Sequence, residues 1–188
     1  MRLVTVQDNA AYNILTTIGI LRCEPSLATW IHDDNFRKAY DWMVKQMKTK
    51  VGESPEEVTY PIWAWYLFDG QPAKVDMRKN WFKGFKGEHY AITVEIPDEQ
   101  VLLSDEGLWH RVLNDGYLNP ATNEAGYDKN DVWFDSLPTA ARQNEKEASW
   151  QEIFNTKKFK NDWCHQGYYV QACFWELRKD QVVSVRKL

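Results

Sequence analysis

Residues 60–68, YPIWAWYLF, form the longest nearly unbroken apolar and aromatic run in the chain. Its length and its Trp, Tyr and Ile content are typical of a buried β-strand, and Pro61 fits only near the strand start. Side chains alternate across a strand, so Trp63 and Trp65 share one face and the small Ala64 points to the other. Two interpretations are open: a central strand with a Trp-rich core face, or two indole rings that wall a pocket for a flat ligand.

The composition favours one globular domain over residues 1–188. The length is within the ~100–200 residues usual for a single domain, and 44% hydrophobic residues are enough to build a core. Ten tryptophans are far above ordinary usage. Because an indole buries a large apolar body and usually keeps a partner for its N–H, this enrichment indicates either an aromatic core or a surface that stacks on rings and sugars.

The charge distribution argues against one class of partner. A formal net charge of −4 does not favour nonspecific binding to duplex DNA, which depends on lysine and arginine neutralising phosphates. Residues 74–86, KVDMRKNWFKGFK, are locally basic and aromatic, which is the composition of a segment that binds nucleotides or single strands. The alternative is a solvated loop whose rings fold back on the core. Within it, Asp76 and Arg78 form either an anion clamp or a surface ion pair.

The cysteines and the hydropathy pattern exclude further classes. Three cysteines, Cys23, Cys164 and Cys173, make an odd number without a short metal-ligand spacing, so we expect reduced thiols and no metal site. The first residues carry no apolar leader, and no run approaches the ~18 apolar residues of a membrane span. The expectation is therefore a cytoplasmic protein that does not insert into a membrane.

The remaining periodicity predicts about six strands and four or five helices. Strands are expected at 3–7, 60–68, 90–96, 101–103, 168–177 and 181–186. Helices are expected after Asp8 as far as Gly19, from Pro25 to about His32, over 34–51, from a Ser104 cap to Gly116, and after a Ser149 cap. Residues 117–144 are turn-rich and are predicted to be a mobile loop. Helices early and hairpin-like strands late indicate an α+β fold, a single compact domain with a mixed or largely antiparallel sheet.

Several polar residues lie where a ligand would be contacted. Glu176 stands in the apolar stretch FWEL, where burial would raise its pKa and suit it to act as an acid, a base or a hydroxyl acceptor; the alternative is an exposed carboxylate paired with Arg178 or a cross-strand lysine. Thr5 and Gln7 share a face at the end of the first strand, where they either contact a ligand or face solvent. His110, beside the inward stripe of its helix, would serve as an acid or base only if a pocket opens there.

The motifs VTVQ, AYDWMVKQM, YPIWAWY, VEIPDEQVLLSDEGLWHRVLN and VQACFWELRKDQVVSV resemble a bacterial family described as domain of unknown function 3841. The resemblance spans nearly the whole chain and implies a small, cytoplasmic, bacterial or phage-linked protein of one domain. It supplies no activity.

A remoter likeness concerns the ADP-ribosyltransferase folds. A first strand with a polar pair, followed by a short helix ending in Gly19-Ile20-Leu21, resembles their opening. In the DNA-modifying toxins of that group a late strand carries Gln-Ala followed by an acidic residue; here Gln171-Ala172 is followed by Cys173. The likeness implies that Gln7 contacts the nicotinamide ribose, that Trp63 or Tyr66 flanks the ring, and that Glu176 grips a ribose hydroxyl.

Three hypotheses of function follow. The first is an NAD-using transferase, with NAD as a substrate and Glu176 stabilising an oxocarbenium-like cation. The second is a non-catalytic module that binds a nucleotide, a modified base or a single strand by stacking on Trp63 and Trp65. The third is a protein-interaction partner without a small ligand, which would expose an apolar patch. The sequence leaves the oligomeric state open.

Overall fold

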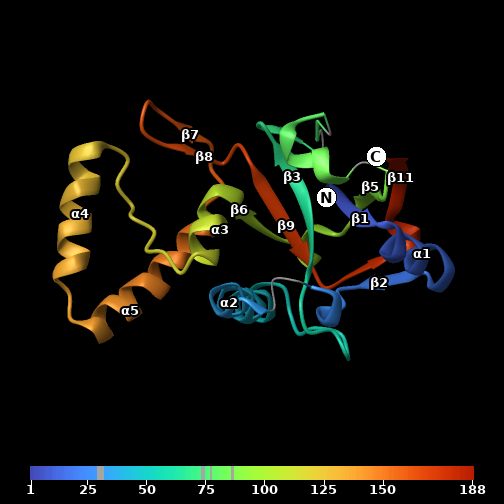
Figure 1. Ribbon diagram of the computed structural model, residues 1–188, viewed down its shortest axis with the longest axis horizontal. Coiled ribbons are helices and arrows are strands. Elements are labelled where there is room, and N and C mark those ends of the chain that lie inside the picture. Colours follow the sequence, from blue (N-terminus) through green and yellow to red (C-terminus); the bar gives the residue numbers. More distant parts are fainter. Residues whose placement is uncertain (29–31, 73–74, 77, 86) are drawn as a thin grey trace.

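The computed structural model describes residues 1–28, 32–72, 75–76, 78–85 and 87–188. The main sheet has the strand order β11-β5-β1-β3-β9-β6, with β4 beside β3, and every pairing in it is antiparallel (Figure 1). Its strands are β1 Arg2–Asp8, β3 Ile62–Phe68, β4 Gln71–Pro72, β5 His89–Glu95, β6 Leu102–Asp105, β9 Val170–Phe174 and β11 Val182–Lys187. Two separate strand pairs are β2 Ile20–Arg22 with β10 Glu176–Arg178, and β7 Phe159–Lys160 with β8 His165–Gln166.

Five α-helices accompany these strands in the described residues, which confirms the α+β class. They are α1 Asn9–Ile18, α2 Asp34–Lys50, α3 Glu106–Leu113, α4 Glu124–Ser136 and α5 Thr139–Ser149. Short 3-10 turns are η1 Pro25–Leu27, η3 Asn80–Phe85, η4 Asp98–Gln100, η5 Trp150–Phe154 and η6 Lys179–Gln181. The expected helix from Pro25 to His32 is therefore one short turn as far as Leu27, and residues 29–31 lie outside the described residues, as do Lys74 and Lys86 of the basic segment.

Strand β3 is the centre of the sheet and is covered on both faces. Ile62 and Ala64 pack in one cluster, opposite Phe174 and Ala172 of β9, together with residues of β1, β5, α1 and β2. Trp63 faces the opposite way, toward a second cluster built by α2, α3 and η5. The predicted alternation is confirmed.

Helix α2 begins and ends as its sequence predicts. The Asp33 carboxylate accepts hydrogen bonds from the backbone N–H groups of Asn35 and Phe36, which caps the helix. Its stripe buries Met43 and Met47 completely against the Trp63 face of the sheet. These methionines are core residues.

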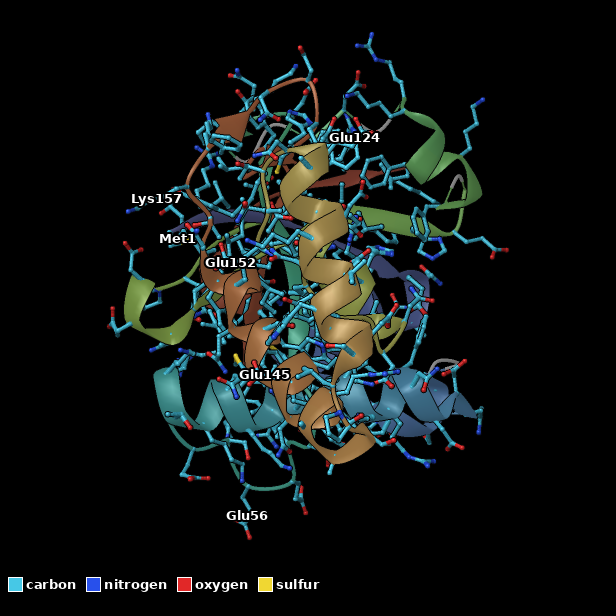
Figure 2. The ribbon with its side chains drawn as sticks, turned by 90° about the vertical axis from the view of Figure 1, so that its left-hand side faces the viewer. Met1, Glu56, Glu124, Glu145, Glu152 and Lys157 are labelled. Atoms are coloured by element: carbon cyan, nitrogen blue, oxygen red, sulfur yellow. The ribbon has the colours of Figure 1, made fainter. Side chains whose placement is uncertain are left out.

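The prediction of a mobile loop over residues 117–144 is wrong, because α4 and most of α5 occupy it. The Asn123 side chain caps α4 by accepting from Gly126 N–H at 2.9 Å, and the Phe134 ring stacks on Tyr117 with centroids 4.1 Å apart. The two helices extend beyond α3, away from the sheet (Figure 1), and Figure 2 shows them crossing the side of the molecule. Neither helix buries a residue completely, so neither carries the apolar stripe that identifies a helix from sequence.

An ion cluster ties this helical pair to the body. Asp115, which follows α3, accepts a hydrogen bond from the Lys38 ammonium of α2 at 3.0 Å and from the Lys146 ammonium of α5 at 2.5 Å. Burial alone would raise the pKa of Asp115, and the two ammonium groups outweigh it and hold that pKa below its usual value. The cluster therefore joins three helices through one carboxylate.

Two predicted caps and one predicted strand also need correction. Asp105, one residue beyond the expected Ser104, caps α3 by accepting from Leu108 N–H at 3.0 Å. The Ser149 hydroxyl does not cap η5; it accepts from Leu118 N–H and donates to the Lys146 carbonyl. The strand expected over 168–177 breaks at Trp175 into β9 and β10, which belong to different sheets.

Candidate functional site

The sheet is incomplete between β1 and β3. β1 pairs with β5 along its whole length, yet with β3 the register contains only Val4 opposite Trp65. In a continued antiparallel ladder Val6 would lie opposite Trp63. Instead the two strands part, and the Thr5 hydroxyl donates a 2.8 Å hydrogen bond to the Trp63 carbonyl in place of a backbone N–H. Because a buried carbonyl without a donor is costly, this bond makes the parting of the strands possible.

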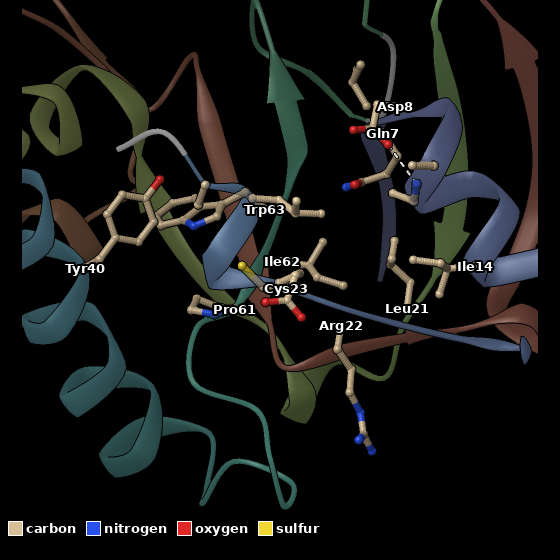
Figure 3. A pocket seen from close by; sticks show the side chains of 16 residues that line it. Gln7, Asp8, Ile14, Leu21, Arg22, Cys23, Tyr40, Pro61, Ile62 and Trp63 are labelled. Atoms are coloured by element: carbon tan, nitrogen blue, oxygen red, sulfur yellow. Dashed lines mark hydrogen bonds between the residues drawn. The ribbon is translucent and has the colours of Figure 1, made fainter. Parts of the chain in front are cut away.

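A cavity of about 320 Å³ lies where the strands part (Figure 3). Val6 and Trp63, the two residues that a continued ladder would have paired, both line it. Its other walls come from the end of β1, from α1, from residues 21–28, from α2 and from the start of β3. Those lining residues include Gln7, Ile14, Arg22, Cys23, Tyr40 and Pro61. The volume lies at the lower end of the range of ligand pockets, so the cavity would enclose one ring of a larger ligand.

The Gln7 side chain is fixed at one wall of this cavity. Its amide nitrogen donates to Thr5 Oγ at 2.7 Å, so Gln7, Thr5 and the Trp63 carbonyl form one relay. Thr5 is fully buried and does not line the cavity; its role here is to orient Gln7. The Gln7 carbonyl oxygen accepts no hydrogen bond from a described residue and is available to a ligand.

The indole of Trp63 forms the opposite wall. It stacks on Trp109, with ring centroids 5.0 Å apart and planes 25° apart, and meets the edge of Tyr40. Its N–H is buried and has no hydrogen-bond partner among the described residues. A buried donor without a partner is uncommon in folded proteins, and because this nitrogen is buried, a ligand would reach it only if the ring moved. Figure 3 shows the ring between Tyr40 and the cavity centre.

Two titratable side chains beside Trp63 stay protonated at neutral pH. Burial raises the pKa of the Cys23 thiol, and the neighbouring Glu24 carboxylate raises it further. Burial likewise raises the pKa of the Tyr40 hydroxyl. A protonated thiol is a weaker nucleophile than a thiolate, and Cys23 contributes surface to the cavity.

Glu176 lies next to the cavity without lining it. It is opposite Arg22 in the β2–β10 pair, and the Arg22 Nε and Nη2 atoms both donate to its Oε2 at 3.2 Å. Arg22 lines the cavity, but Figure 3 shows its side chain pointing away from the cavity centre, so its ion pair with Glu176 lies outside the cavity. The ion pair expected for Glu176 exists, but its partner is Arg22 and not Arg178, which pairs with Asp180.

The other predicted ligand contacts lie elsewhere. Trp65 packs edge-on against Phe68, at the part of the sheet covered by η3, and Tyr66 packs in the cluster on the opposite face. Gln171 is opposite Ser104 and Trp65 in the sheet.

Two further predicted contacts, Arg78 and His110, are exposed and each lies beside a carboxylate. Arg78 is 92% exposed and pairs with Asp76 at 2.9 Å. Of the two interpretations, an anion clamp or a surface ion pair, the structure has the ion pair. His110 is 62% exposed and pairs with Glu106 at 3.0 Å. None of these five predicted contacts, which are Trp65, Tyr66, Arg78, His110 and Gln171, lines the cavity. Of the predicted residues, Gln7 and Trp63 line it, Thr5 orients Gln7, and Glu176 is connected to the lining residue Arg22.

Sequence reasoning missed Arg22, Cys23 and Tyr40. Tyr40 occupies a regular stripe position of α2, and residues 20–24 show no pattern that distinguishes them from a connecting loop. Only the β2–β10 pairing brings Arg22 to Glu176, over a separation of 154 residues. A single sequence does not show which distant strands pair, so it could not indicate this contact.

The fold is α+β, and the candidate site is a small, mainly apolar cavity at a split in the sheet. Residues 2–183 match the model of a family described as "Domain of unknown function (DUF3841)", and the chain belongs to that family. No curated protein and no solved structure matches the chain. In the part of the chain that the structure describes, no helix has the length and apolar character to cross a bilayer, and no group of three metal-ligating side chains assembles.

Proposed function

We propose that the cavity binds a ring carrying a carboxamide, that NAD is the ligand that supplies it, and that the chain transfers ADP-ribose. One observation carries the proposal: the Gln7 amide is fixed by Thr5 at the wall of a cavity formed where β1 and β3 part. A polar group held in one orientation on a rigid strand is what ligand discrimination requires.

The Gln7 amide offers a matched pair of contacts. One of its N–H groups is given to Thr5, which leaves the second N–H as a donor and the carbonyl oxygen as an acceptor. A primary carboxamide presents the same two functions in reverse, so two hydrogen bonds form side by side. The nicotinamide ring would then lie among Ile62, Trp63 and Ile14, where apolar atoms predominate. Of the two residues expected to flank the ring, Trp63 lines the cavity and Tyr66 does not.

Glu176 is the group that would act on the ribose. Its Oε2 is held by Arg22, and its Oε1 accepts no hydrogen bond from a described residue. In the proposed reaction the bond between ribose C1′ and the nicotinamide nitrogen breaks, and its electron pair returns to the ring. An acceptor oxygen or nitrogen forms the new bond to C1′ and loses its proton. A carboxylate that binds a ribose hydroxyl stabilises the positive charge that develops between these events.

Binding is tested by thermal unfolding with nicotinamide, NAD and adenosine monophosphate. A ligand at about 100 times its dissociation constant stabilises the fold by roughly 2.7 kcal/mol, which raises the midpoint by about 5–10 °C. We expect shifts with nicotinamide and NAD that Gln7→Leu abolishes. A shift with adenosine monophosphate alone would instead support a nucleotide-binding module, and no shift with any of the three would refute a role for the cavity in binding them.

Chemistry is tested separately by following the release of nicotinamide from NAD. Glu176→Gln keeps the hydrogen bond to Arg22 and should retain NAD binding while losing turnover. Glu53→Gln is the control, because Glu53 also pairs with a cation, Lys48 at 3.1 Å, and neither residue lines the cavity. If wild-type protein binds NAD and releases no nicotinamide in the presence of candidate acceptors, the binding half of the proposal stands and the transferase half fails.

A second candidate function is protein interaction through α4. Val132 is 72% exposed and Trp133 is 44% exposed on that helix, which buries no residue of its own. A solvent-facing Val-Trp pair on a helix away from the sheet is the kind of surface that a protein partner covers. Co-purification of a partner that Trp133→Ala releases would support this function, and unchanged co-purification would exclude α4 as the contact.

A further inference from the structure

The β7–β8 hairpin is a basic and aromatic element outside the cavity. Residues 157–166, KKFKNDWCHQ, hold three lysines against one aspartate in a chain whose net charge is −4. Phe159 is 41% exposed and Trp163 is 48% exposed, so two aromatic rings of this one hairpin face solvent. Solvent-facing rings between lysines are costly for folding and useful for stacking on bases.

The hairpin is held rigidly before any ligand arrives. At its tip, Asn161 Oδ1 accepts from the backbone N–H groups of Trp163 and Cys164 at 2.9 and 2.6 Å. At its base, Gly167 N–H donates to the buried Asp105 carboxylate at 2.7 Å. Lys158 is used internally, because its ammonium donates to the Gly70 carbonyl at 2.8 Å. Rings and charges presented on such a support bind with little loss of conformational entropy.

Two lysines are left to meet a partner. Lys157 and Lys160 are exposed and form no ion pair with the described residues, and Lys157 lies at the outer edge of the molecule (Figure 2). Beside the hairpin, a hollow of about 300 Å³ is lined by Trp163 and His165 on one side and by Arg111 and Tyr127 on the other. The Tyr127 ring meets the edge of the Trp163 ring, with centroids 5.8 Å apart.

We propose that this hairpin binds single-stranded nucleic acid, with a base stacked on Trp163 and backbone phosphates contacted by Lys157 and Lys160. Two unpaired lysines favour an anionic partner, and two exposed rings favour one that carries a flat face on every charged unit, as a nucleic acid does. Bases in a duplex are already stacked on one another, so the rings select the single strand. The inference does not depend on what the cavity binds.

The test is fluorescence anisotropy with labelled oligodeoxyuridine and oligouridine of about 12 nucleotides, without NAD. Trp163→Ala should weaken binding between about fivefold and a hundredfold, and Trp163→Phe should restore most of it. Trp133→Ala is the matched control, since it removes an equally exposed indole from α4.

The charge contribution is measured by titration between about 50 and 200 mM salt. Losing two phosphate contacts in the double variant Lys157→Ala and Lys160→Ala should reduce the slope of log affinity against log salt by about 1.4. The matched control removes Lys45 and Lys129, which belong to α2 and α4.

Several results would overturn the inference. They are the absence of binding, equal loss in the hairpin variants and their controls, or polyglutamate competing as well as the oligonucleotide. Oligodeoxyuridine and oligouridine differ only in the 2′-hydroxyl, so a preference between these two strands identifies the sugar as a further contact, and equal binding places recognition on the bases and phosphates. Circular dichroism of each variant separates loss of binding from loss of fold.

Discussion

Gly167, at the base of the hairpin, has less room for a Cβ than any other glycine of the chain. Its φ is +75°, and a Cβ built there would lie 2.6 Å from the Lys157 carbonyl oxygen and 2.7 Å from that of Thr156. Both atoms are backbone, so no side-chain rotation relieves the contact. Gly167→Ala should therefore destabilise the fold through two separate terms.

The magnitudes of the two terms can be separated by a control. An alanine in the left-handed region costs roughly 1–2 kcal/mol, and forcing atoms into a filled space adds about 1–3 kcal/mol. Gly19→Ala isolates the first term, because Gly19 has φ +89° and open space around its would-be Cβ. We expect a loss of about 3–4 kcal/mol for Gly167→Ala, which lowers the midpoint by about 10 °C. For Gly19→Ala we expect a loss of about 1 kcal/mol.

Urea denaturation of the three proteins, followed by circular dichroism, gives the free energies of unfolding. The reasoning requires Gly167→Ala to lose clearly more than Gly19→Ala at an unchanged m-value. Equal losses of stability in Gly167→Ala and Gly19→Ala would show that the left-handed backbone alone explains the need for glycine at position 167. The close approach of residues 156–157 would then play no part in holding the hairpin.

Other perturbations test the remaining structural claims. Thr5→Val removes the donor to a buried carbonyl and the acceptor of the Gln7 amide, and should cost about 1–3 kcal/mol in urea denaturation; a neutral result would mean that β1 and β3 can close. Asp115→Asn should cost about 1 kcal/mol at pH 7. Because the folded-state pKa of Asp115 is lowered, its contribution is present above the unfolded value near 4 and is lost as pH falls through the folded value, so the difference between wild type and variant should vanish in acid. Met43→Ala should cost about 2–5 kcal/mol, since the side chain is completely buried, and a smaller loss would show that α2 repacks.

The fold could be predicted from the sequence where side chains repeat at the period of the element. The run from Tyr60 to Phe68 and the stripe of α2 both carry that repeat, and both were located within two residues. Helix α4 has no such stripe because none of its residues is buried in the core; it is held by the stack of Phe134 on Tyr117 and by polar contacts to Asn119. The break at Trp175 was equally invisible, since the strand-like pattern continues while the chain changes sheets.

The candidate site could be predicted only in part. Thr5, Gln7 and Trp63 were recognised because polar or aromatic residues at strand ends are local features. The cavity itself forms because β1 and β3 pair at one position only. A single sequence does not show which strands pair or how far the pairing extends. Trp65 was grouped with Trp63 by alternation alone, yet twist and different covering elements place them in separate clusters.

The order of strands in the sheet constrains how the chain is made as well as how it is folded. Strand β9 lies between β3 and β6, although about 65 residues separate it from the later of these two in the sequence. During synthesis, the apolar edge of β3 therefore stays open until the residues around Val170 have left the ribosome. A chain that stalls before that point exposes an aromatic edge strand, so nascent chains of this protein would need a chaperone or rapid elongation through α4 and α5.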